Sequence, residues 1–206
     1  MKLHEPQCPS LAMPERLVRY AEASMPTRLG DFRLVIYRTE SGLEPIAIVE
    51  GDPAGEGTLA RVHSECWTGE VLGSLRCDCR EQLEASLEAI RARGRGVVVY
   101  LRQEGRGIGL GNKVRAYGLQ DGGADTVDAN LMLGFPDDMR TYEVAAAILD
   151  DLRVRSVELM TNNPRKLAAL EALGIHVIQR LPHWSADHEH NHGYLQVKRA
   201  RQGHLP

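Results

Sequence analysis

Three of the four cysteines lie close together in the sequence and could bind a metal ion. Cys66, Cys77 and Cys79 fall within fourteen residues, whereas Cys8 lies far from them. A catalytic zinc ion usually takes three protein ligands and keeps a fourth position for water, while a structural zinc ion takes four. Because His63 could supply a fourth ligand, both kinds of zinc site stay open. A third interpretation is that the thiols pack as small apolar groups.

The charge of a three-cysteine site predicts that neighbouring groups must assist it. Three thiolates would leave the zinc complex with a net negative charge, so a bound water would be acidified less than at a neutral three-histidine site. We therefore expect a base or hydrogen-bond donor nearby, and Glu65 and His63 are close in sequence. Cys77 and Cys79 also precede a predicted helix, whose N-terminal dipole would favour thiolates.

A glycine-rich segment, RQEGRGIGLGNK over residues 102–113, is the second feature that could do chemistry. The dinucleotide fingerprint is incomplete here, and the P-loop pattern is absent because no lysine is followed by Ser or Thr in the required place. A flexible turn at a helix N-terminus, flanked by Arg102, Arg106 and Lys113, could nevertheless cradle phosphate groups. An ordinary loop between a strand and a helix is the alternative.

Composition limits the classes of function. The 206 residues, 43% hydrophobic and 26% charged, are typical of one globular domain. A net charge of -3 gives no general attraction to nucleic acid or membranes, so an anion site must be local. The longest apolar run, over residues 97–101, is far shorter than the roughly 20 residues of a membrane span. Because Glu5 and Pro6 interrupt the position of a signal peptide's apolar stretch, we expect a cytoplasmic protein.

The elements that must position these features fall into three predicted regions. Four prolines suggest a loosely ordered arm over residues 1–28, with one short helix around residues 15–23. Residues 29–182 form the predicted catalytic domain. Residues 183–206 form a polar tail rich in histidine, which we expect to be mostly mobile.

Periodicity predicts the elements of the domain. Residues that favour β-structure predict strands over residues 31–37, 45–49, 58–63, 96–101, 157–160 and 177–180. Apolar residues at helical spacing predict helices over residues 78–94, 140–152 and 164–173, the last with Asn163 as its N-cap. The first half is β-rich with antiparallel hairpins, and helices alternate with strands after residue 78. We therefore predict an α+β, or mixed α/β, single domain built on a mixed sheet.

Taken together, the motifs closely resemble the GTP cyclohydrolase II family. The resemblance runs from about Asp31 to Pro182, and the segments that carry it are HSEC at 63–66, CDC at 77–79, QEGRGIGL at 103–110, RAY at 115–117, DTV at 125–127, LGF at 133–135 and TNNP at 161–164. It implies hydrolysis of GTP to 2,5-diamino-6-ribosylamino-pyrimidinone phosphate, formate and pyrophosphate, the first committed step of riboflavin synthesis. It also implies one zinc ion per chain, Mg²⁺ with the triphosphate, and a homodimer.

The resemblance assigns roles to individual residues. By matching motif, Cys66, Cys77 and Cys79 are the implied zinc ligands. Asp138 matches the family's proton acceptor, Arg140 its proposed nucleophile towards the α-phosphate, and Tyr117 a tyrosine associated with completing the ring chemistry. The substrate contacts implied in the same way are Arg61, Val62, His63, Ser64, Glu65, Gln82, Glu104, Gly105, Arg106, Thr126, Thr161 and Lys166.

Physical chemistry supports these roles unequally. A guanidinium, with a pKa above about 12, is a poor nucleophile, so we expect Arg140 to stabilise charge on the phosphate instead. Considered alone, Asp138 would be a surface acid in a turn, Tyr117 a core aromatic residue and Lys166 a solvated charge. Two alternative functions are a related enzyme that stops at the formylated, ring-opened product or uses another substrate, and a catalytically silent nucleotide-binding regulator.

Overall fold

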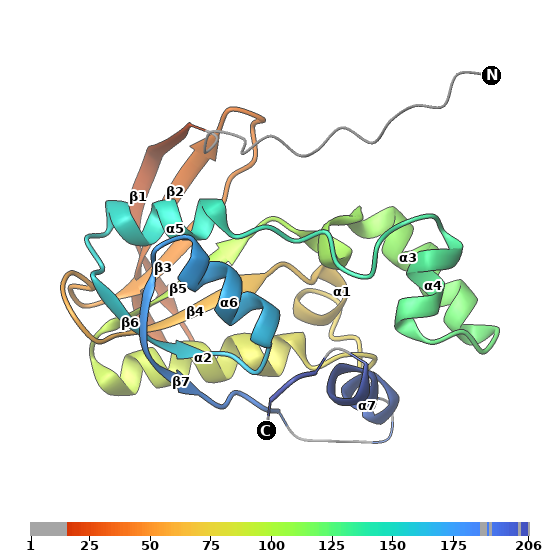
Figure 1. The fold of residues 1–206 in the computed structure, drawn as a ribbon. Helices are drawn as coiled ribbons and strands as arrows, with labels where there is room; N and C mark the ends of the chain where they lie inside the picture. Colours follow the sequence, from red (N-terminus) through yellow and green to blue (C-terminus); the bar gives the residue numbers. More distant parts are fainter. Residues whose placement is uncertain (1–15, 186–188, 190, 202, 206) are drawn as a thin grey trace.

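The computed structural model describes residues 16–185, 189, 191–201 and 203–205. The first fifteen residues of the predicted arm, with Cys8, lie outside this range, as do His188 and His190 of the tail. A mixed sheet forms the centre of the fold (Figure 1). Its strands are β1 (Leu17–Thr27), β2 (Gly30–Thr39), β3 (Ile46–Glu50), β4 (Thr58–Ser64), β5 (Gly96–Leu101), β6 (Ser156–Met160) and β7 (His176–Leu181).

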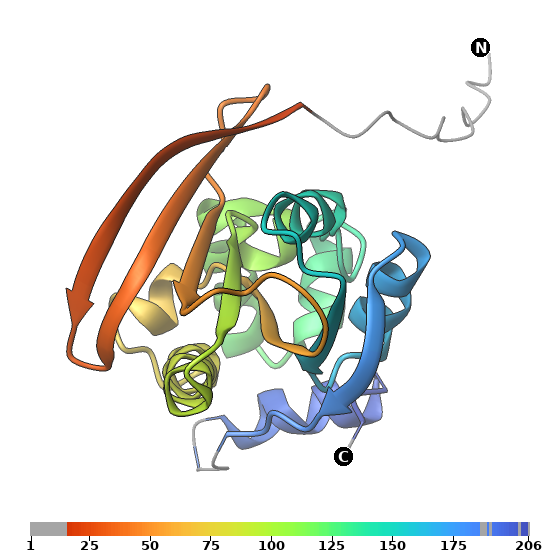
Figure 2. The same cartoon turned by 90° about the vertical axis from the view of Figure 1, so that its left-hand side faces the viewer.

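Strand order combines an antiparallel part with a parallel part. The order across the sheet is β1-β2-β3-β5-β4-β6-β7. The pairs β1/β2, β2/β3 and β3/β5 are antiparallel. The pairs β5/β4, β4/β6 and β6/β7 are parallel. Figure 2 shows β1 and β2 as a long curved hairpin at one edge. This arrangement confirms the predicted α+β class with one mixed sheet.

Helices cover both faces of the sheet and connect its strands. The helical segments are α1 (Trp67–Glu70), α2 (Cys79–Arg93), the 3₁₀ turn η1 (Glu104–Gly107), α3 (Gly109–Asp121), α4 (Thr126–Met132), α5 (Glu143–Asp151), α6 (Pro164–Ala172) and α7 (His192–Ala200). Successive side chains of a strand point to opposite faces of the sheet. Because helices cover both faces, the side chains of the central strands are buried on both. Val97 and Val99 of β5 pack with α5 and α6 on one face, and Val98 packs beside Ile90 of α2 on the other.

Local signals account for the helix boundaries. Asn163 accepts hydrogen bonds from the backbone amides of Arg165 and Lys166, as an N-cap residue should. Pro164 follows at the first helical position, where its missing N–H costs nothing. Helix α2 ends at Gly94, whose φ of 69° is in the left-handed region that glycine adopts readily.

The two ends of the chain differ from the prediction. The short helix predicted around residues 15–23 is wrong from Leu17 onward, because residues 17–27 form β1 and pair with β2 along its whole length. Pairing with a neighbouring strand outweighs local propensity there. The expectation of a mostly mobile tail is also wrong for its described residues, since α7 packs on the domain and buries Leu195 completely.

The parallel strands place the candidate chemistry at one edge of the sheet. Strands β4, β5 and β6 end at Ser64, Leu101 and Met160, so the HSEC, glycine-rich and TNNP segments all emerge at their carboxyl ends. Open sheets commonly bind ligands in this position. Among the described residues, the structure contains no helix both long and apolar enough to cross a membrane.

Candidate active site

A cavity of about 870 Å³ opens at the carboxyl ends of the parallel strands. Its walls come from the end of β4, from the segments that follow β5 and β6, from the start of α2, and from α3 and α7. This volume lies within the range of known small-molecule sites. Most of the residues with predicted roles line it, namely Arg61, His63, Ser64, Glu65, Cys66, Cys77, Cys79, Gln82, Glu104, Gly105, Arg106, Tyr117, Arg140, Thr161 and Lys166.

Three of the predicted residues need separate description. Val62 does not line the cavity: its side chain is fully buried in the core, and its carbonyl accepts a hydrogen bond from Lys166 Nζ. Asp138 lies behind Arg140 rather than on the cavity wall. Thr126 begins α4, and its side chain is outside the described part of the structure.

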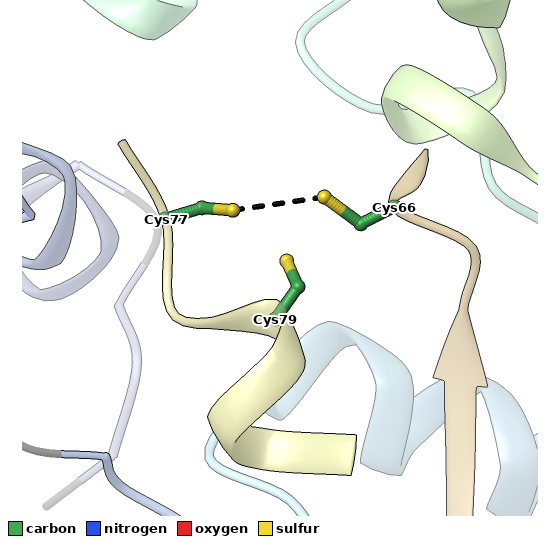
Figure 3. A group of neighbouring side chains, drawn as sticks. All are labelled: Cys66, Cys77 and Cys79. Carbon is green, nitrogen blue, oxygen red and sulfur yellow. Dashed lines mark hydrogen bonds between the residues drawn. The ribbon is translucent and has the colours of Figure 1, made fainter. Parts of the chain in front are cut away.

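The three cysteines form a compact group of sulfur atoms on one wall. Cys66 precedes α1, while Cys77 and Cys79 lie at the start of α2. Figure 3 shows their sulfurs pointing towards a common centre. All three lie within 4.8 Å of one another, and the sulfurs of Cys66 and Cys77 are 3.6 Å apart. Zinc–sulfur bonds of about 2.3 Å in tetrahedral geometry require sulfur–sulfur distances of about 3.8 Å, so the cluster fits this ion.

Gly69 leaves room for the sulfur cluster. A Cβ atom at this position would lie 3.0 Å from the sulfur of Cys77 and 3.3 Å from that of Cys66. Both distances are shorter than ordinary van der Waals contact, so a larger residue would displace the thiols. The short helix α1 therefore provides a backbone surface against which the ligands can converge.

Glu70 organises the backbone beside Cys66. Its carboxylate accepts hydrogen bonds from His63 Nε2 at 2.7 Å, from the hydroxyl of Tyr100 at 2.5 Å and from the amide of Cys66 at 3.1 Å. His63 therefore pairs with Glu70 and is not part of the cysteine cluster, which removes the four-ligand interpretation left open by the sequence. Burial lowers the pKa of His63, while Glu70 opposes that shift.

Lys113 supplies the donor that a negatively charged thiolate site requires. Its ammonium lies 3.1 Å from the sulfur of Cys66 and 2.8 Å from Glu104 Oε1. Burial disfavours the charged ammonium, but the negative charge of Cys66 and the hydrogen bond to Glu104 raise the pKa of Lys113. In turn, hydrogen bonds from Cys77, Cys79 and Lys113 lower the pKa of the Cys66 thiol. The sequence suggested Lys113 as a phosphate contact, whereas the structure places it against the sulfur of Cys66.

Glu104 braces the glycine-rich segment. Besides Lys113, its carboxylate accepts hydrogen bonds from the amides of Trp67 at 2.6 Å and Gly105 at 2.8 Å. The next two residues adopt left-handed backbone conformations, with φ of 61° at Gly105 and 60° at Arg106. A residue other than glycine rarely adopts this conformation, and such strain concentrates at functional sites.

A group of buried cations forms another part of the wall. Arg61 donates to the carbonyl of Met160 and to Gln82 Oε1, and Lys166 donates to the carbonyl of Val62. Within the described part of the chain, neither has a carboxylate within 4.0 Å. Burial lowers the pKa of Arg61 to about 10. Burial and the nearby charges of Arg61 and Arg140 lower the pKa of Lys166.

The buried cations leave bonding capacity for an anion. In the described structure, Arg61 Nε and His63 Nδ1 are buried without a hydrogen-bond partner. Unsatisfied buried polar groups are costly and rare in native proteins. Both residues line the cavity, so a bound ligand with acceptor and donor groups could satisfy them.

Arg140 is held by the carboxylate of Asp138. Its Nε and one terminal nitrogen donate to the two oxygens at 2.8 and 2.5 Å, forming a bidentate pair. Burial would lower the pKa of this guanidinium, but Asp138 raises it; the same pairing lowers the pKa of Asp138 despite burial. Asp138 is therefore an ionised acceptor that orients Arg140 towards the cavity.

Tyr117 and Glu65, two further predicted site residues, each lie beside cationic side chains. Tyr117 of α3 has the guanidinium of Arg76 at 5.0 Å and the ammonium of Lys113 at 5.8 Å from its ring centre. Burial raises the pKa of its hydroxyl. Glu65 pairs with Arg102 at 3.4 Å, and burial raises the pKa of its carboxyl group.

Sequence reasoning missed the residues that come from the tail. Tyr194, Lys198 and His204 line the cavity, and Lys198 pairs with Asp78 at 2.7 Å. Asp78 lies between two cysteines at a helix N-terminus, which could have marked it as a buried acceptor. The partner of that carboxylate is 120 residues away in the sequence, so spacing does not indicate the pair.

The fold and the site together define the class of this protein. One mixed sheet has a three-cysteine cluster and a cationic cavity at the carboxyl ends of its parallel strands. The sequence profile of GTP cyclohydrolase II matches residues 18–182. The chain therefore belongs to the GTP cyclohydrolase II family of enzymes.

Individual relatives agree with this assignment. The chain is 52% identical over 187 residues to the GTP cyclohydrolase-2 of Aeromonas hydrophila, covering 90% of this chain and 95% of the relative. It is 52% identical over 191 residues to the GTP cyclohydrolase-2 of Pseudomonas aeruginosa, covering 92% and 93%. It is 53% identical over 190 residues to the riboflavin biosynthesis protein RibBA of Bacillus subtilis, covering 91% of this chain. The chain spans about half the length of RibBA, because the match covers 48% of it.

Proposed function

We propose that this protein is a zinc-dependent GTP cyclohydrolase II, which hydrolyses GTP to 2,5-diamino-6-ribosylamino-pyrimidinone phosphate, formate and pyrophosphate. The observation that carries the proposal is the presence, in one cavity, of a three-thiol cluster and of two buried basic side chains, Arg61 and Lys166, that have no carboxylate partner among the described residues. The first suits a metal ion that activates water, and the second suits a triphosphate. Family membership and the names of the relatives support this substrate.

Cys66, Cys77 and Cys79 would hold the zinc ion, because their sulfurs already converge and no fourth protein ligand accompanies them among the described residues. When bound, the zinc would act as a Lewis acid that activates water for hydrolytic opening of the imidazole ring of guanine. Lys113 donates a hydrogen bond to the Cys66 sulfur and offsets part of the negative charge of the thiolates. Glu70 fixes the Cys66 backbone amide, which limits movement of this ligand.

The cationic wall would bind the triphosphate and assist pyrophosphate release. Arg61 and Lys166 are buried basic groups, and no carboxylate of the described residues lies within 4.0 Å of either, so a bound anion would stabilise their charged forms. Arg140 presents a planar guanidinium held by Asp138, suited to stabilise charge on the α-phosphate during its transfer. Mg²⁺ would accompany the triphosphate, since phosphate oxygens are ligands that this hard cation prefers. A cytoplasmic homodimer is part of the same proposal.

The proposal is tested by incubating the protein with GTP and Mg²⁺ and identifying all products by mass spectrometry, together with the zinc content of the protein. We expect one zinc per chain and equal amounts of the pyrimidine product, formate and pyrophosphate. A product that retains the formyl group would favour the related enzyme that stops at ring opening. Binding of GTP without any product would favour a silent regulator and would refute the proposal.

Two variants separate the metal site from the phosphate site. Cys77→Ser should lose zinc after purification, because two thiolates are too few for a tetrahedral site with one water. Cys79→Ser should release some pyrophosphate but no formate, if the thiol cluster serves ring opening and Arg140 serves the phosphate. Full zinc occupancy and unchanged turnover in Cys77→Ser would refute the ligand assignment.

A further inference from the structure

The C-terminal segment, defined here as the described residues between 183 and 205, lies beyond the part of the chain that matches the family profile. It nevertheless contributes side chains to the cavity, including Tyr194, Lys198 and His204. In Figure 1, α7 lies beside the N-terminal end of α2, where Cys77 and Cys79 are located. The segment therefore covers a wall that the family-matched residues leave incomplete.

Buried contacts fix the segment in this place. Leu195 is completely buried, and Lys198 has a side-chain exposure of 9% against Asp78, which is fully buried. The last described residue, Leu205, donates its amide to the carbonyl of Asn162 and accepts a hydrogen bond from the indole of Trp184. Two separate regions of the domain, at Asp78 and at Asn162, therefore hold the segment, which distinguishes it from a chain end resting on the surface.

The ammonium of Lys198 reaches the cationic wall through a chain of hydrogen bonds. Asp78 accepts from Lys198 at 2.7 Å through one oxygen, and from Gln82 Nε2 at 2.6 Å and the hydroxyl of Ser185 at 2.9 Å through the other. Gln82 then accepts from Arg61 at 2.5 Å through its own oxygen. Loss of Lys198 would free the buried carboxylate of Asp78 to draw these partners away from the cavity.

The segment also contributes directly to the cavity surface. The ammonium of Lys198 lies 4.3 Å from the centre of the Tyr194 ring, which holds that ring against the cavity. Burial lowers the pKa of His204 to about 3, and the positive charges of Lys198, Arg140 and Arg106 act in the same direction. His204 is thus close to the cations that would bind phosphate.

We propose that the C-terminal segment is an integral wall of the nucleotide-binding site, and that Lys198 is the positioning residue that joins this wall, through Asp78 and Gln82, to Arg61. The inference rests on the proposed function, because the ligand it invokes is the guanine nucleotide. The inference assigns roles in nucleotide binding to Tyr194 and Lys198, which lie outside residues 18–182, the part of the chain that matches the family profile.

The test uses the full chain with zinc and the analogue guanosine 5′-(α,β-methylene)triphosphate with Mg²⁺, from which pyrophosphate cannot be released. Hydrogen exchange of the peptides that cover residues 191–205 is measured with and without the analogue. We expect the analogue to slow exchange in these peptides in the wild-type protein. Unchanged exchange there, with analogue bound, would overturn the proposal whatever the variants do.

Variants then test Lys198 itself. Lys198→Met should weaken analogue binding and raise the KM for GTP about tenfold or more, with zinc content unchanged, while Lys198→Arg should recover part of the affinity. Arg93→Met is the matched control, because Arg93 forms an exposed ion pair with Glu158 away from this cavity. Wild-type affinity and KM in Lys198→Met would overturn the positioning role. If Lys198→Met does not fold, the same comparison is made with Tyr194→Leu.

These outcomes are distinct from failure of the proposed function. If the protein is not a GTP cyclohydrolase, the wild type will form no products from GTP, whether or not it binds the analogue. If only the further inference is wrong, the wild type will bind and turn over, and Lys198→Met will match Arg93→Met in both measurements.

Discussion

Single residues in this protein have partners that change their chemistry. The Cys66 sulfur contacts Lys113 as well as the other two thiols, and Arg140 is gripped by both oxygens of Asp138. In each case a charged group is buried beside its opposite, which favours the ionised form of both groups. Substitutions at these positions should therefore change charge and geometry in separable ways.

Lys113→Met should weaken zinc binding by about tenfold or more, as is usual when a partner of a metal ligand is removed. The physical reason is that the ammonium stabilises the thiolate of Cys66, so its loss lets protons compete better with the metal. Competition with a coloured chelator measures the affinity. Lys113→Arg, which keeps the positive charge, serves as the control, and equal zinc affinity in Lys113→Met and the wild type would contradict the prediction.

Arg140→Ala should reduce turnover on the order of a hundredfold or more, as for removal of one preorganised donor. Arg140→Lys should retain a measurable fraction of the turnover, because lysine keeps the positive charge. Its turnover should still be below that of the wild type, because lysine cannot form the bidentate pair with Asp138. Steady-state kinetics on both variants makes the comparison. A guanylyl adduct on the peptide containing Arg140, formed as fast as turnover in the wild type, would instead establish a covalent role.

At the scale of elements, the site depends on where strands end and helices begin. Helix α6 starts immediately after β6, with Asn163 as its cap and Lys166 in its first turn. Helix α2 starts at Cys79, directly after Asp78. Because Cys77, Cys79 and Lys166 are each within a turn of a helix start, correct helix initiation sets the position of these parts of the cavity wall.

Asn163→Ala should lower the free energy of unfolding by about 1 kcal/mol, the usual effect of removing an N-cap side chain. The amides of Arg165 and Lys166 would lose their acceptor. Urea unfolding of the metal-loaded protein measures this change. Asn163→Asp can still cap the helix and should retain most of the stability. If Asn163→Ala is as stable as the wild type, packing alone sets this helix end.

At the scale of the whole molecule, the C-terminal segment and the domain fold as one unit around buried groups. His183 contacts Ser86 and the carbonyl of Gln82 in α2, and His204 lines the same cavity as Arg61 and Arg140. Burial lowers the pKa of His183 to about 4, with the charge of Arg61 acting in the same direction. Both histidines are therefore neutral in the folded protein at neutral pH.

Stability should fall as the pH decreases from about 6.5 towards 4. Below the ordinary histidine pKa the unfolded chain binds protons that the folded protein does not, so protonation favours unfolding. His183→Gln should make this pH dependence shallower by up to about one proton. Urea unfolding at several pH values, compared between the variant and the wild type, gives the difference. The same slope in both proteins would contradict the prediction.

Much of the fold was predictable because its signals are local. Alternation of apolar residues and the cap at Asn163 depend only on near neighbours in the chain. From residue 31 onward, the predicted strands and the predicted helices all occur. The grouping of Cys66, Cys77 and Cys79 was predictable for the same reason, since thirteen residue steps or fewer separate them. Their metal and the roles of the surrounding residues stay predictions.

Tertiary structure alone decided the partners that lie far apart in sequence. Lys113 reaches Cys66, and Lys198 reaches Asp78, only because the strand order brings β4, β5 and β6 together and α7 packs beside α2. Residues 17–27 became a strand through pairing with β2, against their local appearance. Such contacts arise from burial and sheet pairing between remote segments, which single residues and short spacings do not encode.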